Sequence, residues 1–117
     1  MSNLFYKDGV LFCEEVPVSD IALKYGTPSY VYSKKTLEDN FDAYSNAFIE
    51  NEGMVCFSVK SLSNISVLRL LSEKGSGFDI VSGGELERVI AAGADPKKII
   101  FTGIAKTNAE IIQGIKK

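Results

Sequence analysis

The residue with the clearest chemical potential is Lys60, which directly follows the mostly apolar run of residues 54–59. Such a run is typical of a buried strand in a parallel sheet. Parallel α/β folds bind their ligands at the carboxyl ends of the strands, and Lys60 occupies that position. Partial desolvation there favours the neutral amine, a nucleophile that forms Schiff bases with aldehydes. The alternative is a lysine whose amine extends from the strand end into water.

A carboxylate, Asp79, lies within a second apolar run, residues 78–81. A charged group inside a buried strand needs a partner. Lys60 on the neighbouring strand is the candidate partner, and the alternative is a strand-end carboxylate that reaches solvent.

The segment Ser82-Gly83-Gly84-Glu85 follows this second run and has the S-x-x-E form of a capping box, which predicts the start of a helix. Its glycines could also bring backbone amides close to an anion, but the simple cap is favoured, and no G-x-G-x-x-G dinucleotide motif is present. Lys106 follows a third run, where it meets an anion or lies exposed in a loop. Cys56, in the middle of the first run, is predicted to be a packing residue.

A repeated strand–helix pattern positions these residues. Buried strands are expected at residues 54–59, 78–81 and 99–102, and each is followed by an amphipathic helix. This order predicts a parallel sheet covered by helices, with right-handed connections. The strand spacing of about 20–25 residues fits a (β/α) barrel or a doubly wound sheet. A full barrel needs about 250 residues, so the barrel interpretation predicts a truncated chain with about three βα units. The first of these helices is expected to carry Val67, Leu68 and Leu71 on one face, and the second Leu86, Val89 and Ile90. The third is expected after a capping box at Thr107–Glu110 and carries Ile111, Ile112 and Ile115.

The residues before position 54 predict a different organisation. Alternation around Asp8-Gly9 indicates a hairpin over residues 5–12. A short helix over residues 20–25, capped by Ser19 and ended by Gly26 and Pro28, is followed by an expected strand at 29–32. A longer helix is expected to begin at Ser33 or Thr36 and end at Gly53, with its apolar side chains in a helix-to-sheet core: Leu37, Phe41, Tyr44 and Phe48.

Composition excludes several classes of function. The 117 residues carry a net charge of −2, which disfavours nucleic acid as the main partner. The chain has no histidine, so histidine metal sites and Ser-His-Asp or Cys-His catalysis are excluded within it. Its two cysteines are too few for a disulfide scaffold or a structural zinc site. Neither a signal peptide nor a membrane span is predicted, and a cytoplasmic location is expected.

Four segments in order also resemble a known family. They are residues 25–32 (YGTPSYVY), 57–61 (FSVKS), 78–86 (FDIVSGGEL) and 100–103 (IFTG). Together they resemble the N-terminal part of diaminopimelate decarboxylases, which belong to the alanine-racemase-like, fold type III enzymes dependent on pyridoxal 5′-phosphate. The resemblance covers nearly the whole chain. The SGGE segment favours diaminopimelate over ornithine or arginine decarboxylases.

The resemblance implies roles for three residues. Lys60 matches the lysine that holds pyridoxal 5′-phosphate as a Schiff base, Asp79 matches an acid near that amine, and Glu85 matches an acid on the next helix. It further implies a (β/α)8 TIM barrel preceded by a short β segment. Residues 1–33 would pack with a C-terminal β-domain, and residues 34–117 would form the first part of the cofactor-binding barrel. Ser61 and Leu62 stand where the family usually has Ala-Asn, and Ile104 stands where it often has asparagine.

The implied reaction converts meso-2,6-diaminopimelate to L-lysine and carbon dioxide, in a homodimer without metal. The ring-stacking histidine, the phosphate loop and most specificity residues would lie beyond residue 117, so the 117-residue chain alone is expected to be inactive. Two alternatives stay open at this stage. One is a related pyridoxal-phosphate decarboxylase with another amino-acid substrate, and the other is a complete, non-catalytic α/β binding module.

Overall fold

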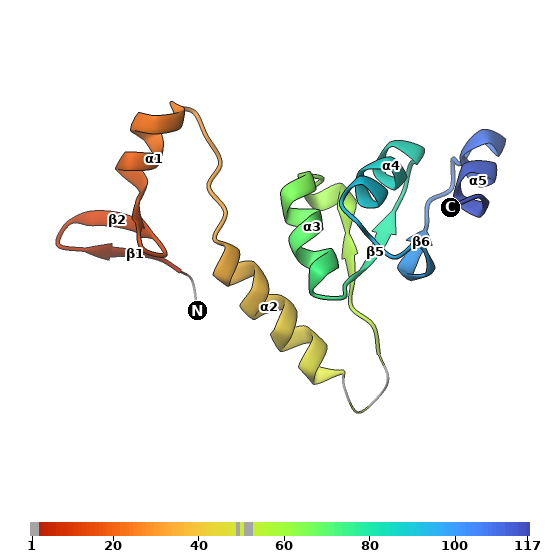
Figure 1. Ribbon diagram of the computed structural model, residues 1–117, viewed down its shortest axis with the longest axis horizontal. Coiled ribbons are helices and arrows are strands. Elements are labelled where there is room, and N and C mark those ends of the chain that lie inside the picture. The colour runs from red at the N-terminus through yellow and green to blue at the C-terminus, as the bar shows by residue number, and fades with distance from the viewer. Residues whose placement is uncertain (1–2, 49, 51–52) are drawn as a thin grey trace. The chain divides into compact units, whose positions relative to one another are not determined.

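The computed structural model describes residues 3–48, 50 and 53–117 (Figure 1). The chain divides into two compact units, Met1–Asp42 and Ala43–Lys117. The predicted domain boundary lies earlier, between residues 33 and 34, and stays a prediction.

The first unit begins with a three-stranded antiparallel sheet, in the order β1 (Leu4–Lys7), β2 (Val10–Cys13) and β3 (Val16–Pro17). Asp8 and Gly9 connect β1 to β2 with φ angles of 51° and 77°. Positive φ at both central residues is what a two-residue type I′ hairpin turn requires. The predicted hairpin is therefore confirmed, whereas β3, at two residues, is too short to produce an alternating pattern.

Helix α1 (Val18–Tyr25) starts earlier than predicted. Its N-cap is Pro17, which makes no side-chain capping bond, and Ser19 lies inside the helix, so the predicted Ser19 cap is wrong. Gly26 ends the helix as predicted: its φ is 81° and its amide donates to the carbonyl of Ala22 at 2.9 Å. The expected strand at residues 29–32 is also wrong, because this segment is irregular and Tyr30 is 91% exposed. Aromatic and β-branched residues favour a strand only where a partner strand is available.

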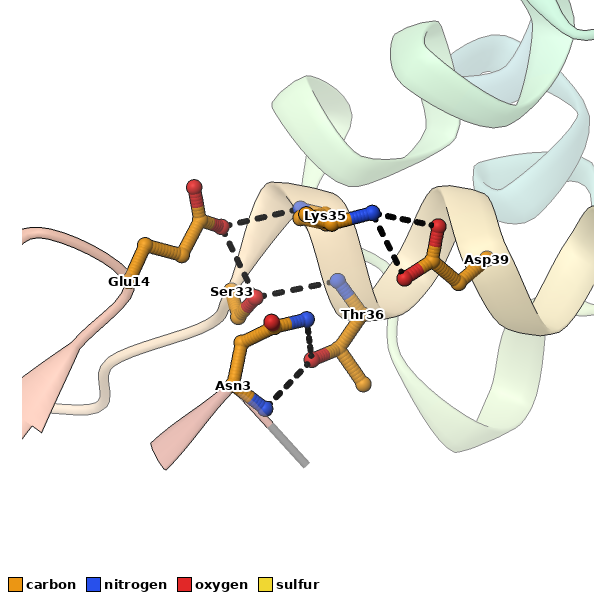
Figure 2. Close-up of polar contacts among 6 residues, drawn as sticks. All are labelled: Asn3, Glu14, Ser33, Lys35, Thr36 and Asp39. Carbon is orange, nitrogen blue, oxygen red and sulfur yellow. Dashed lines mark hydrogen bonds and ion pairs between the residues drawn. The ribbon is translucent and has the colours of Figure 1, made fainter. Parts of the chain in front are cut away.

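Helix α2 (Lys34–Ala47) begins where Ser33 caps it. The Ser33 hydroxyl accepts from the amide of Thr36 at 3.0 Å and donates to the Glu14 carboxylate at 2.7 Å (Figure 2). Glu14 also accepts from the Lys35 amide at 2.9 Å, and Asn3 donates to the Thr36 hydroxyl from both its backbone amide and its side chain. These bonds attach the hairpin sheet to the first turn of α2. They also confirm Ser33, rather than Thr36, as the start of the helix.

The apolar stripe of α2 is only partly buried. Phe41 is 9% exposed, but Tyr44 is 65% and Phe48 is 46% exposed. The expected core position is therefore wrong for Tyr44 and Phe48. Helical periodicity identifies an apolar face, but it does not show whether another element covers that face.

The second unit contains a parallel sheet in the order β4 (Cys56–Ser58), β5 (Gly77–Ile80) and β6 (Ile99–Phe101). The strands lie in register, with Phe57 opposite Phe78 and Phe78 opposite Ile99. The helices between and after them are α3 (Ile65–Glu73), α4 (Gly83–Ala91) and α5 (Asn108–Ile115), with one-turn 3-10 helices η2 (Val59–Ser61) and η3 (Pro96–Lys98). The predicted parallel sheet is confirmed. β4 is shorter than predicted, and Met54 lies outside it with half of its surface exposed.

The connections place the three helices on one face of this sheet. Strands adjacent in sequence are adjacent in space, and right-handed crossovers between them put each helix on the same side. In agreement, α3 packs against α4 and α4 against α5 (Figure 1). Between these helices and the sheet, Phe78, Ile80, Leu68, Val59 and Val89 are fully buried. One covered face is the arrangement of a (β/α) barrel, whereas a doubly wound sheet has helices on both faces.

No helix among residues 3–48, 50 and 53–117 is long and apolar enough to span a membrane.

Candidate active site

The candidate site lies at the carboxyl ends of β4, β5 and β6. Lys60 is the middle residue of η2, two positions after the last residue of β4. The Ser61 hydroxyl donates to the Ser58 carbonyl at 2.7 Å, and this bond stabilises the tight turn that carries the lysine away from the sheet.

Lys60 is exposed, whereas its neighbour Val59 is fully buried. The partial desolvation expected from the apolar run is therefore wrong. In the described part of the chain, the Lys60 amine has no hydrogen-bond or ion-pair partner. A free amine at the carboxyl end of a parallel sheet is available to react with an aldehyde.

Asp79 lies on the face of the sheet that carries no helix. Phe78 and Ile80 are fully buried under the helices, and side chains alternate along a strand, so Asp79 faces the other way. Its neighbours on this face are set by the register, with Ser58 beside it on β4 and Thr102 just after β6. The helix-free face is thus lined by small and polar residues, with one isoleucine among them: Cys56, Ser58, Gly77, Asp79, Ile100 and Thr102.

The partner of the Asp79 carboxylate is a hydroxyl. Thr102 Oγ1 donates to Asp79 Oδ1 at 2.6 Å, and Ser58 Oγ lies 3.5 Å from Oδ2. The ion pairs Lys34–Glu38 and Lys35–Asp39 lie elsewhere, and in the described part of the chain the expected pair between Lys60 and Asp79 is not formed. The two hydroxyls belong to the flanking strands and reach the carboxylate directly, whereas Lys60 extends from the turn after its strand.

Glu85 is half-buried in the first turn of α4. Its amide donates to the Ser82 hydroxyl at 3.2 Å, which confirms Ser82 as the N-cap. Its carboxylate accepts from the amide of Val81 at 2.7 Å rather than from that of Ser82. Glu85 therefore stabilises the chain where it leaves β5, the strand that carries Asp79.

The glycine pair after Ser82 does not offer a free anion site. The amide of Gly83 donates to Glu110 Oε1 at 2.9 Å, so a carboxylate from α5 already occupies the first turn of α4. A Cβ atom on Gly83 would lie 2.9 Å from Gln113 Oε1, so this glycine permits the close approach of α5. The bond from Gly83, followed by those from Thr107, lowers the pKa of the Glu110 carboxyl below its ordinary value.

Two features at the end of β6 complete the description. The Lys106 amine donates to the carbonyls of Thr102 (2.8 Å) and Gly103 and lies 5.2 Å from the Phe101 ring centroid. The Lys106 amine is thus hydrogen-bonded to the backbone at the end of β6. It neither contacts an anion nor projects freely from a loop, the two alternatives predicted from the sequence. The Thr102 hydroxyl was not predicted as a site group, although its place directly after the third strand was a usable signal.

Cys56 is a packing residue, as predicted. It is half-buried, and burial, with a smaller contribution from Asp79, raises the pKa of its thiol. Cys13 and Cys56 are both free thiols. In the described ranges no group of three or more histidine, cysteine, aspartate or glutamate side chains could hold a metal ion.

The residues present fit part of an aldehyde cofactor. Lys60 supplies the amine that would hold the aldehyde, and Asp79 supplies a carboxylate that is already oriented by a hydroxyl. The N-terminus of α4 does not fit its phosphate, because the amides of Gly83 and Glu85 are bonded to protein oxygens. A parallel (β/α) sheet with helices on one face and polar groups at its carboxyl end defines the architecture as part of a (β/α) barrel.

Comparison with known proteins gives the family. Residues 34–116 match the family described as "Pyridoxal-dependent decarboxylase, pyridoxal binding domain". The chain belongs to this family, whose cofactor is pyridoxal 5′-phosphate.

Individual relatives agree with this assignment. The chain is 50% identical over 115 residues to a diaminopimelate decarboxylase from Haemophilus influenzae, a match that covers 97% of this chain and 28% of the relative. It is 48% identical to the diaminopimelate decarboxylase of Vibrio cholerae, covering 96% of this chain and 27% of that protein. A crystal structure of an Aquifex aeolicus protein superposes with a TM-score of 0.91 at 41% identity, covering 97% of this chain and 28% of the other.

A diaminopimelate decarboxylase from M. jannaschii, solved with L-lysine, also has a TM-score of 0.91, at 38% identity, over 97% of this chain and 27% of that one. These matches confirm the barrel interpretation of the sheet. The chain spans about 28% of the length of the relatives it matches.

Proposed function

We propose that the protein to which this chain belongs is a diaminopimelate decarboxylase, which converts meso-2,6-diaminopimelate to L-lysine and carbon dioxide. The observation that carries the proposal is the free, exposed amine of Lys60 at the carboxyl end of the barrel sheet. Its support is the identity of about 50% to a diaminopimelate decarboxylase over nearly the whole chain.

In this proposal, three residues of the chain serve the cofactor. Pyridoxal 5′-phosphate supplies an aldehyde that condenses with amines and a conjugated ring that accepts the electron pair of a broken bond. Lys60 would hold the aldehyde through its side-chain amine. Asp79 accepts a hydrogen bond from the bound amine, and Glu85 fixes the segment after β5 beside it.

Several features of the whole protein belong to the same proposal. Residues 1–33 pack with a C-terminal β-domain, and residues 34–117 form the first part of the cofactor-binding barrel. The protein works as a homodimer in the cytoplasm, on an amino-acid substrate. The crystal structure of the M. jannaschii enzyme in complex with L-lysine supports a product of this class.

The test uses the protein expressed from its complete reading frame. We expect release of carbon dioxide from diaminopimelate, and loss of that release in Lys60→Ala. Lys97→Ala is the matched control, because Lys97 is an exposed lysine of η3 away from the strand ends that form the site.

Borohydride reduction in the presence of pyridoxal phosphate should add the cofactor mass to the peptide that contains Lys60. Wild-type activity in Lys60→Ala would contradict the assignment. Activity with ornithine or arginine in place of diaminopimelate would indicate a related decarboxylase. Absence of pyridoxal phosphate binding would favour the alternative of a non-catalytic α/β binding module.

A further inference from the structure

We propose that Thr102 is a positioning residue, whose hydroxyl holds the Asp79 carboxylate in the orientation that Lys60 and its cofactor require. The inference rests on the proposed function, because only that function places a cofactor beside Asp79. It extends that function to a residue on a third strand, which neither the motifs nor the family match assigned.

The hydroxyl of Thr102 has one proton and two acceptors within reach. Asp79 Oδ1 lies at 2.6 Å and the carbonyl of Ile80 at 3.3 Å. Hydrogen bonds to ionised acceptors are shorter and stronger than those to neutral ones, so the proton goes to the carboxylate.

The backbone of Thr102 is fixed on both sides. Its amide donates to the Ile80 carbonyl at 2.8 Å, and its own carbonyl accepts from the Lys106 amine at 2.8 Å. Threonine is also β-branched, which restricts rotation about χ1. The hydroxyl donor of Thr102 therefore reaches Asp79 from a rigid position. The hydrogen bond from Lys106 helps to hold the Thr102 backbone there.

The two carboxylate oxygens of Asp79 have unequal environments. Oδ1 is bound at 2.6 Å, whereas Oδ2 has only the Ser58 hydroxyl at 3.5 Å, the outer limit of a hydrogen bond. Oδ2 is thus left able to accept from a bound group. A carboxylate held through one oxygen and open at the other is suited to orienting an amine or a ring nitrogen.

The experiment measures the Kd for pyridoxal 5′-phosphate, by visible absorption, in the protein from the complete reading frame. Thr102→Val keeps the shape of the side chain and removes the donor, and we expect Kd to rise about tenfold. Thr102→Ser restores the hydroxyl and should bind within about twofold of wild type. If Thr102→Val does not fold, Thr102→Ala removes the same donor without adding a methyl group in its place.

A double-mutant cycle separates positioning from general support of the fold. In the Asp79→Ala background, Thr102→Val should leave Kd unchanged, because the acceptor that the hydroxyl serves has been removed. If the wild-type protein binds the cofactor, the inference would be overturned in two cases. One is that Thr102→Val raises Kd equally in both backgrounds, and the other is that it raises Kd in neither. Failure of the wild-type protein to bind pyridoxal phosphate would instead overturn the proposed function, and this inference with it.

Discussion

At the scale of single residues, Gly77 on β5 has no room for a side chain. A Cβ atom there would lie 2.6 Å from Cys56 Sγ and 2.8 Å from the carbonyl oxygen of Lys98. The carbonyl belongs to the backbone and cannot move aside easily. Gly77 is therefore required by the spacing of the sheet that carries Asp79, two residues further along β5.

We accordingly expect Gly77→Ala to lower the free energy of unfolding by about 1–3 kcal/mol, through overpacking. The control is Gly84→Ala in α4, where the nearest atom to a Cβ would be Ser82 Oγ at 3.9 Å. That substitution should be neutral, or stabilising by up to about 1 kcal/mol, because alanine favours a helix over glycine. Urea unfolding monitored by circular dichroism checks both, and equal stability of the two variants would contradict the steric argument.

Residue types and positions could be predicted from the sequence at this scale, but the contacts of the side chains could not. The apolar run before Lys60 located the amine at the correct end of the correct strand. Its exposure depended on the turn of η2, which carries the lysine away from the buried Val59. The partner of Asp79 likewise depended on strand register, which brings Thr102 close across 23 residues of sequence.

At the scale of elements, a carboxylate joins the last two helices of the second unit. Glu110 caps its own helix α5 by accepting from the amide and hydroxyl of Thr107, each at 2.9 Å, and caps α4 through the amide of Gly83. The ionised form accepts these bonds, which is why the pKa of Glu110 is lowered from its ordinary value of 4.5. One side chain therefore stabilises the N-termini of two helices.

The sign of the resulting pH dependence follows from that lowered pKa. A carboxyl with a lower pKa in the folded state stabilises the fold above its unfolded pKa, and the contribution is lost as the pH falls through the folded value. We expect Glu110→Gln to be less stable than wild type at neutral pH, with the difference shrinking as the pH drops below about 4.5. Thermal unfolding midpoints across this range measure it. Glu73→Gln, at an exposed end of α3, should show no such convergence.

A second junction of elements lies in the first unit, where Ser33 connects the hairpin sheet to α2. Its hydroxyl both accepts from Thr36 and donates to Glu14 (Figure 2). We expect Ser33→Ala to cost about 1–2 kcal/mol in the free energy of unfolding, as for the loss of an N-cap. Ser29→Ala, in the irregular segment before it, should cost less than about 0.5 kcal/mol. Chemical denaturation of the two variants tests this, and equal losses would refute the capping role.

The elements that could be predicted were those with a strong local signal. The Asp8-Gly9 turn, the three parallel strands and the caps at Ser82 and Thr107 follow from short-range chemistry and are confirmed, although of the three strands only β5 is largely buried. β3 was not predicted, and the strand predicted at residues 29–32 is wrong, because pairing decides which segments form strands. The two residues of β3 form a strand because β2 lies beside them. Residues 29–32 have higher β-propensity, but no described strand pairs with them.

At the scale of the whole molecule, each unit leaves apolar surface in contact with water. In the second unit, Ile112 is 51% and Ile115 is 80% exposed on α5. β4 and β6 each have one neighbouring strand in the described sheet, so the other side of each carries unpaired backbone groups. Large exposed apolar side chains and unpaired strand edges are both features that other protein segments cover.

We therefore expect the isolated 117-residue chain to self-associate, with an apparent mass in sedimentation velocity that rises with concentration. The matched comparison is the variant Ile112→Lys/Ile115→Lys, which puts charge on the exposed face of α5 and should shift the chain toward monomer. Both positions lie outside the buried core, so the far-UV circular dichroism spectrum should not change. A wild-type chain that stays monomeric at every concentration, and unfolds cooperatively, would contradict this expectation. It would show that the apolar surface of α5 and the open edges of β4 and β6 do not drive association.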